Sequence, residues 1–265
     1  MKHSTLTEFL YQLIALFVAL IFVHAIYIAI VRPNAESLLE AQRISQAAGE
    51  AFEVERSFYV VIKDYEQEAC FVLMLWATAI MGFKMHRTLG ERRLLTAKFI
   101  EIPSGTKILP EDARRHSRSI ESVTDTMREA LLPRALLAGL RRFGSSQDVS
   151  NVSDAVREVC ETEAERLDTD LSMIRYIVWA IPSIGFIGTV RGIGQALGQA
   201  HRAVEGDIVG VTTSLGVAFN STFIALVISL FVMFLMHQLQ LLQERLVLDT
   251  QSYCDINLLR HLATR

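Results

Sequence analysis

Hydroxyl and amide side chains interrupt two apolar segments near the end of the chain, where lipid-facing helices would carry leucine. The segments are residues 181–198 (IPSIGFIGTVRGIGQALG) and 211–236 (VTTSLGVAFNSTFIALVISLFVMFLM). Each is long enough to cross a bilayer as a helix, which takes about 20 residues. Polar groups are costly in hydrocarbon, so these side chains should face other helices or a wet path. The pattern favours an ion path shared between subunits over a simple anchor.

Thr189 and Thr213 are the strongest candidates for residues of that path. A hydroxyl both donates and accepts hydrogen bonds, so it can hold a water molecule or replace part of an ion's hydration shell. Thr213, Gly216 and Asn220 are spaced i, i+3 and i+7, which places them on one helix face. The alternative interpretation is structural: each hydroxyl bonds to its own i−4 carbonyl or to a neighbouring helix. The sequence leaves both open.

Small residues recur at four-residue spacing in the same segments, which is typical of closely packed membrane helices. One run, Gly192-Ile193-Gly194, also resembles the start of a dinucleotide-binding motif. No strand pattern precedes it and the next glycine is one residue too far, so we do not expect nucleotide binding. The glycines expected at helix contacts are Gly185, Gly188, Gly192 and Gly216, and further small pairs are Gly185 with Thr189 and Gly194 with Gly198.

Charged residues are scarce inside the apolar segments. No Asp or Glu lies within the core of a predicted span, so a titrating carboxylate would have to come from another polypeptide. Arg191 should face a cavity, pair with Asp207 or a partner's carboxylate, or extend to the membrane surface. His24 could titrate, but a single histidine in a span is more often a packed or interfacial residue.

Composition indicates a polytopic membrane protein with one sizeable aqueous portion. The chain has 265 residues, is 51% hydrophobic and has a mean hydropathy of +0.31. Periodicity predicts an all-α fold with four spans, at residues 9–31, 69–83, 174–197 and 208–236. Cys70, Cys160 and Cys254 have no metal-ligand or disulfide spacing, and no catalytic dyad is evident, so we expect neither a cofactor nor an enzyme.

The distribution of basic residues predicts the orientation. Residues 84–170 hold 15 of the 26 Lys and Arg, including Lys84, Arg87, Arg92 and Arg93 at the membrane edge, so this segment should be cytoplasmic. Residues 32–68 hold four basic and eight acidic residues and should lie outside. Both termini are then cytoplasmic. The alternative for the first span, a cleaved signal peptide ending near Ala25, is disfavoured because apolar sequence continues to Val31.

Four regions follow from this reading. Residues 1–68 form the first span and an outer amphipathic helix from Pro33 to Glu68. Residues 69–170 form the second span and cytoplasmic helices at 84–99, 111–130, 134–143 and 152–170, with a linker at 144–148 and a cap at Ser150 or Ser153. Residues 171–236 form the pore hairpin, and residues 237–265 form a cytoplasmic C-terminal helix.

The polar segments resemble the MotA/TolQ/ExbB proton channel family, over about residues 69–240. Residues 182–190 (PSIGFIGTV) are similar to the P-x-x-G-x-x-G-T-V stretch of the ExbB and TolQ branch, and residues 213–216 (TSLG) to its T-A-[IL]-G. Pro182 matches a proline that MotA-like proteins carry at the cytoplasmic side of the path. The long cytoplasmic segment between the second and third spans also matches, whereas the first span is additional to the three of ExbB.

The resemblance implies a homopentamer in the bacterial inner membrane around two copies of a single-span ExbD-, TolR- or MotB-like partner. The partner's Asp would carry H⁺, or Na⁺, past Thr189 and Thr213, and ion flow would drive mechanical work. No nucleic acid is implied. The sequence departs from the family pattern where Arg191 replaces a Trp, Ile208 a Glu, Asn220 an Ala and Thr222 a Pro.

Two other classes of protein compete with this interpretation. A purely structural membrane scaffold predicts that loss of hydroxyls is tolerated, whereas bulky residues at Gly188 are not. A small-solute transporter or a membrane enzyme has no inverted repeat, catalytic dyad or metal cluster in its favour.

Overall fold

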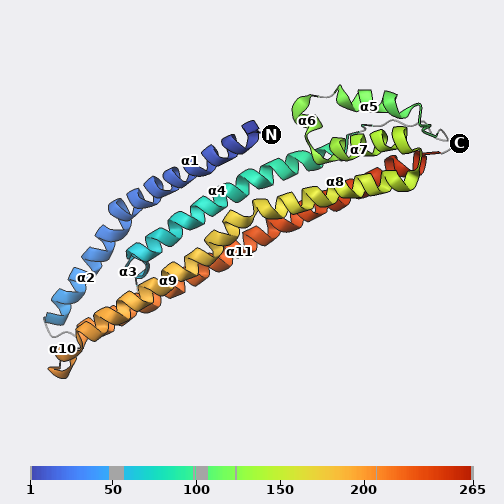
Figure 1. Ribbon diagram of the computed structural model, residues 1–265. Coiled ribbons are helices and arrows are strands. Elements are labelled where there is room, and N and C mark those ends of the chain that lie inside the picture. Colours follow the sequence, from blue (N-terminus) through green and yellow to red (C-terminus); the bar gives the residue numbers. More distant parts are fainter. Residues whose placement is uncertain are drawn as a thin grey trace. The chain divides into compact units, whose positions relative to one another are not determined.

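The computed structural model describes residues 2–47, 57–97, 99, 107–122, 124–206 and 208–263. Every element described in these ranges is helical, apart from one isolated β-bridge between Ile108 and Leu262 (Figure 1). The predicted all-α fold is confirmed. Within these ranges four helical stretches are long and apolar enough to cross a membrane, which agrees with the predicted number of spans: Leu6–Ala41, Tyr65–Leu94, Val149–Gly198 and Val209–His261. The chain forms two compact units, which are taken separately below.

The first unit comprises Met1–Met81 and Met173–Met236. Its helices are α1 (Lys2–Ile26), η1 (Tyr27–Val31), α2 (Arg32–Ala47), α3 (Phe58–Ile62), the first part of α4 (Tyr65–Leu94), α9 (Ser172–Gly198), α10 (Ala200–Val204) and the first part of α11 (Val209–Asn257). Two hydrogen bonds join α1 to α4: the Tyr11 hydroxyl donates to the Ala79 carbonyl at 3.1 Å, and the Trp76 indole to the Gln12 carbonyl at 2.9 Å. The additional N-terminal helix is therefore bonded to α4 within the apolar region.

A π-helical turn, η1, joins α1 to α2. The Arg32 N–H bonds to the Tyr27 carbonyl five residues back, and Pro33 follows directly. Proline has no N–H, and its ring clashes with the carbonyl four residues earlier, so it disfavours an ordinary α-helical turn at this point. The wider π-helical turn accommodates Pro33, so the helical backbone continues from α1 into α2.

The segment between the first two spans differs from the prediction of one amphipathic helix. The structure has two helices there, α2 and α3, and residues 48–56 lie outside the described residues. The second span begins earlier than predicted, because α4 starts at Tyr65 rather than at residue 69. A short helix, α10, follows α9 where the sequence predicted only a loop.

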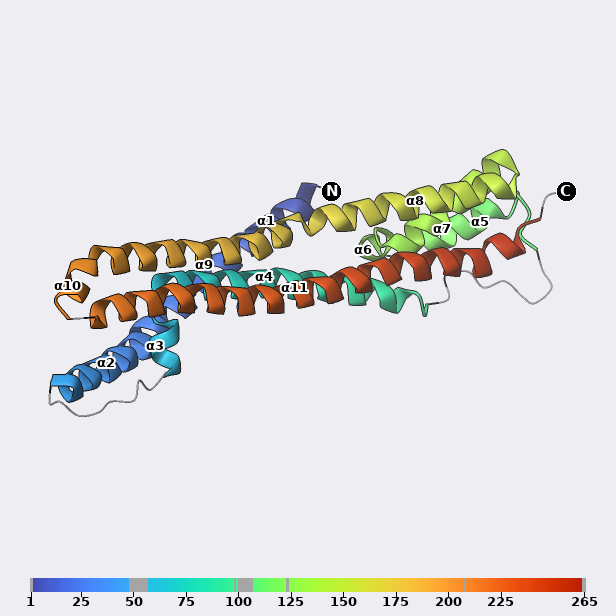
Figure 2. The same ribbon diagram turned by 90° about the horizontal axis from the view of Figure 1, so that it is seen from below.

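The second unit comprises Gly82–Ser172 and His237–Arg265. It contains the end of α4, α5 (Ala113–Glu121), α6 (Asp125–Arg128), α7 (Leu131–Ser146), α8 (Val149–Asp170), the end of α11 and η2 (Leu259–His261). Helix α7 contacts both α5 and α8 (Figure 2). It buries Leu136, Leu140 and Phe143 in a core with Leu258, which lies between α11 and η2. Burial of such apolar side chains stabilises the unit by about 1.5–3 kcal/mol each.

Several helix ends in this unit differ from the predicted ones. Helix α7 begins at Leu131 and includes Pro133 in its first turn, where a missing N–H costs little. The Leu131 N–H is satisfied by the Glu91 carboxylate at 3.1 Å. Helix α8 is capped by Asp148, which accepts from the Ser150 N–H at 3.0 Å, so the expected cap at Ser150 or Ser153 was wrong by a few residues. The linker between α7 and α8 is shorter than the predicted residues 144–148, since α7 continues to Ser146.

The three cysteines are all buried, with Cys70 and Cys254 fully so and Cys160 2% exposed. Thiols in such surroundings are inert, because the reactive thiolate is disfavoured by burial. We therefore expect a membrane-impermeant maleimide to leave the folded protein unmodified and to label it after denaturation in SDS. A Ser145→Cys variant supplies the control, since the exposed position should label at once. Fast labelling of a native cysteine in the folded protein would contradict the described packing.

Candidate functional site

Three glycines bring helices α9 and α11 into close contact over their apolar lengths (Figures 1 and 2). A Cβ added to Gly188 would lie 2.5 Å from the Ser221 Cβ, and one added to Gly192 would lie 2.8 Å from the Ala218 backbone nitrogen. These positions leave no room for a side chain. The contact, called the glycine seam below, consists of Gly185, Gly188 and Gly192 against Ser214, Ala218, Ser221 and Ala225.

Gly192→Ala is expected to destabilise the first unit by about 1–3 kcal/mol, because the new methyl group collides with the α11 backbone. Gly194→Ala is the matched control, since a Cβ there meets nothing within 4 Å. Alanine is the better helix former, so the control should be neutral or gain up to ~1 kcal/mol. Thermal unfolding of both variants in detergent checks the difference, and equal midpoints would contradict the seam.

The other small residues singled out in the sequence lie away from this contact. A Cβ on Gly194, Gly198 or Gly216 meets no other group within 4 Å in the described chain. The packing role of Gly216 stays a prediction.

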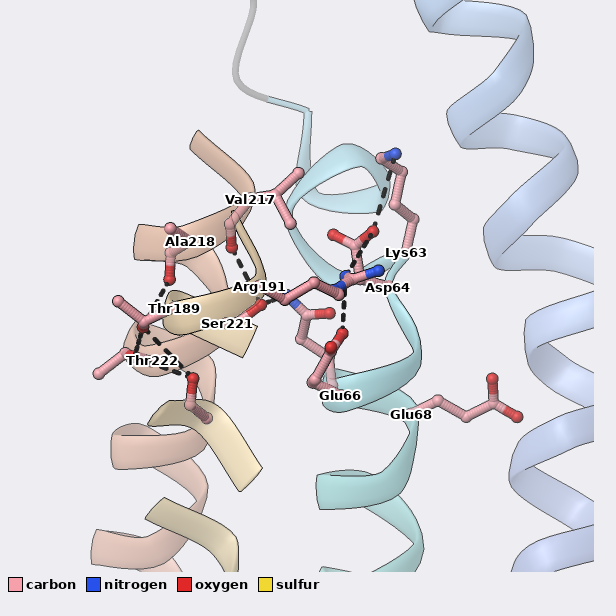
Figure 3. A network of polar contacts seen from close by, with 12 residues as sticks. Lys63, Asp64, Glu66, Glu68, Thr189, Arg191, Val217, Ala218, Ser221 and Thr222 are labelled. Carbon is pink, nitrogen blue, oxygen red and sulfur yellow. Dashed lines mark hydrogen bonds and ion pairs between the residues drawn. The ribbon is translucent and has the colours of Figure 1, made fainter. Parts of the chain in front are cut away.

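Thr189 lies on the glycine seam and shares a hydroxyl pair with Thr222 (Figure 3). The Thr189 hydroxyl lies 3.1 Å from the Ala218 carbonyl and 3.3 Å from the Gly185 carbonyl, and the Thr222 hydroxyl lies 3.1 Å from the same Gly185 oxygen. Two hydroxyls and two carbonyl oxygens therefore meet at one point between α9 and α11. The sequence placed Thr222 among the polar side chains that should face other helices or a wet path and noted it as a departure from the family pattern, but it did not pair Thr222 with Thr189.

Thr213 is not brought to Thr189 within the chain. Its side chain is exposed and its hydroxyl donates to the Val209 carbonyl of its own helix at 2.9 Å. Asn220 is half-buried on the same helix. Thr189 and Thr213 both bond to backbone carbonyls of their own chain, as the structural interpretation of these hydroxyls predicts. A role in ion passage remains a prediction for both residues.

Pro182 lies inside α9, which continues through it. Its missing N–H would leave the Val178 carbonyl without its helical donor. The Ser229 hydroxyl of α11 donates to that carbonyl at 3.2 Å, and Ser229 is buried. A side chain from the neighbouring helix thus replaces the lost backbone bond and adds a polar contact to the α9–α11 pair.

Arg191 points away from the seam towards the start of α4, where it meets two carboxylates (Figure 3). Its guanidinium lies 2.8 Å from the Glu66 carboxylate and 3.7 Å from that of Asp64. Neither partner was predicted, and Asp207, which was, lies outside the described residues. Burial raises the pKa of Asp64, whereas the charges of Lys63 and Arg191 lower it.

Glu68, two residues after Glu66 in α4, forms a second charged contact. Its carboxylate lies 2.6 Å from Nδ1 of His24 and pairs also with Arg32, whose guanidinium stacks 4.4 Å from the centre of the Tyr65 ring. His24 is therefore paired with an acidic residue, rather than simply packed. The polar cluster, as it is called below, consists of His24, Tyr27, Arg32, Lys63, Asp64, Glu66, Gln67, Glu68 and Arg191.

Sequence reasoning missed the carboxylates of this cluster because it began the second span at residue 69. Glu66 and Glu68 lie in the first turn of α4. Acidic residues are favoured there, since they interact with the positive end of the helix dipole. Two acidic residues directly before an apolar run were thus an available signal for an earlier helix start. No group of three His, Cys, Asp or Glu side chains within the described ranges is placed to bind a metal ion.

Comparison with known proteins bears on residues of both units. A family model described as the MotA/TolQ/ExbB proton channel family matches residues 120–252, which include the whole of α9 and most of α11. No significant similarity to a curated protein or to a solved structure was found.

Proposed function

Because the chain belongs to the MotA/TolQ/ExbB proton channel family and is a multi-pass membrane protein, we propose that it conducts ions, most simply protons, and couples their flow to mechanical work. The single observation that carries the proposal is the family match over residues 120–252, which include the whole of α9 and most of α11. The hydroxyl pair of Thr189 and Thr222 on the glycine seam fits this function. Hydroxyls within an apolar helix pair can bond to water or to a proton carrier, whereas an anchor would need only apolar side chains.

The proposed complex is a homopentamer in the bacterial inner membrane, with both termini in the cytoplasm. Two copies of a single-span ExbD-, TolR- or MotB-like partner would occupy its centre and supply the titrating Asp. The exposed apolar side chains of α9 and α11 support further contacts, with lipid or with protein: Phe186, Ile187, Val190, Phe219, Phe223 and Leu230.

The pairing of Arg191 removes one objection to cation flow. A lone guanidinium beside the path would repel protons. Glu66 and Asp64 of the same chain compensate its charge at 2.8 and 3.7 Å. Arg191 therefore needs no carboxylate from the partner.

Native mass spectrometry of the purified membrane complex tests this proposal. Five copies of the chain, isolated together with two copies of a smaller single-span protein that carries an Asp in its span, would support it. A monomer or dimer that persists when the native partner is co-expressed would contradict it.

A structural scaffold is the second candidate, and one observation favours it. The hydroxyls of Thr189, Thr213 and Ser221 each lie within hydrogen-bonding distance of a backbone carbonyl of their own chain. A scaffold would tolerate their loss one at a time, whereas an ion path would not.

A further inference from the structure

Three buried polar atoms of the polar cluster have no hydrogen-bond partner among the described residues: the Tyr27 hydroxyl, Oε1 of Gln67 and Nε of Arg191. Gln67 is fully buried and Tyr27 is 2% exposed. Buried polar groups in folded proteins are nearly always paired, either with protein or with ordered water. Each of these three atoms therefore calls for a hydrogen-bond partner other than the described residues.

The three atoms come from three elements, η1, α4 and α9, and belong to residues near two different carboxylates, those of Glu66 and Glu68. Arg191 of α9 pairs with Glu66, and Arg32, which lies 5.7 Å from the Tyr27 ring, pairs with Glu68. Gln67 lies between these two acidic residues in α4. Its amide nitrogen lies 3.1 Å from the Val61 carbonyl and 3.3 Å from the Ser221 hydroxyl, which leaves its oxygen as the free acceptor.

The charges of the cluster show which ligand fits. Asp64, Glu66 and Glu68 are balanced by three permanent cations, Arg32, Lys63 and Arg191. With no excess negative charge, the cluster has little attraction for a metal cation. The free atoms offer one donor, one acceptor and one hydroxyl that can do either. Water, which both donates and accepts hydrogen bonds, can satisfy each of these atoms.

The cluster also reaches the glycine seam. Ser221, which lies within hydrogen-bonding distance of the Gln67 amide, is the residue that a Cβ on Gly188 would strike. Thr222, the partner of Thr189, is the next residue along α11. A side chain of Glu66 lies against the same glycine, since its Cγ would be 3.2 Å from the added Cβ. Carboxylate, amide and hydroxyl thus lie around Gly188.

We propose that the polar cluster binds buried water, and that this water relays protons between the carboxylates of Glu66 and Glu68 and the hydroxyls of the glycine seam. The relay role rests on the proposed function, whereas the water site does not. Each oxygen of the relay gains one proton from one neighbour as it gives another to the next, so no bond order or redox state changes overall. The site belongs to this chain and is separate from the partner's Asp.

The sign of a stability change tests the water site. If the Tyr27 hydroxyl bonds to water, Tyr27→Phe removes a satisfied bond and lowers the thermal midpoint of the purified complex by about 2–4 °C. If the hydroxyl is unpaired, the same variant removes a penalty, so that the midpoint stays or rises. Tyr176→Phe, at an exposed tyrosine of α9, is the control and should not shift. An unchanged or raised midpoint for Tyr27→Phe would overturn the site.

Proton uptake by proteoliposomes that contain the full complex tests the relay. Gln67→Leu, which removes the free acceptor at nearly constant volume, should lower proton uptake several-fold. The same variant should leave the number of subunits in the complex unchanged. Gln195→Leu, at an exposed glutamine, should match the wild type. Wild-type uptake from Gln67→Leu would overturn the relay. No uptake by the wild-type complex would instead overturn the proposed function, and the Tyr27→Phe result would still decide the water site.

Discussion

Replacement of Thr213 by valine is expected to abolish ion-driven work, down to the level of cells that lack the chain, while the complex assembles normally. Valine keeps the shape of threonine and loses only the hydroxyl. The Thr213 side chain is exposed and, among the described residues, its hydroxyl bonds to the Val209 carbonyl of its own helix, so its loss costs the fold little. The measurement is the cellular work itself, alongside the amount of complex in the membrane.

Thr212→Val is the matched control for this prediction. Thr212 is also exposed. Among the described residues its hydroxyl bonds locally, to the carbonyls of Ile208, which directly precedes α11, and of Val209, but Thr212 lies on a different face of the helix from Thr213. It should retain function. Normal work by Thr213→Val, or equal loss in both variants, would contradict a specific role of Thr213 and favour the scaffold.

Arg191→Gln is expected to destabilise the first unit by about 2–3 kcal/mol. The change leaves Glu66 and Asp64, whose side chains are 12% and 14% exposed, without their shared cation. Breaking a fully buried pair costs about 3–5 kcal/mol, and the partial exposure of Arg191 lowers that figure. Chemical denaturation in detergent, followed by helical content, measures the loss.

A charge swap distinguishes the pair from a general effect of losing Arg191. The double variant Arg191→Glu with Glu66→Arg should recover part of the stability that each single variant loses, because the two groups interact directly. Arg202→Gln, at an exposed arginine of α10, is the control and should stay near the wild type. Additive losses in the double variant would show that Arg191 and Glu66 are not coupled.

The long apolar helices could be predicted from the sequence because length and hydropathy alone define them. Residues 174–197 and 9–31 were predicted as spans, and both lie within stretches of sufficient length and apolar character. The glycine spacing likewise indicated close packing. It could not distinguish Gly192, which meets the α11 backbone, from Gly194, which meets nothing, because that depends on where the neighbouring helix lies.

The polar contacts between distant residues could not be predicted from local pattern. Arg191 and Glu66 are 125 positions apart, and only the folded arrangement of α4 and α9 shows that they pair. The same holds for Ser229, whose hydroxyl replaces the bond that Pro182 removes from Val178. Sequence reasoning instead offered Arg191 a nearby acidic residue, Asp207, as one of its options, and proximity along the sequence alone does not justify that pairing.

The central claim, that this chain forms an ion-conducting complex, is tested most directly by proton uptake into proteoliposomes under an imposed membrane potential. The vesicles would contain the purified complex with its single-span partner. Uptake by the wild-type complex that disappears with Thr213→Val and persists with Thr212→Val is the predicted result. A fully assembled wild-type complex that carries neither protons nor Na⁺ above the level of empty vesicles would contradict the account.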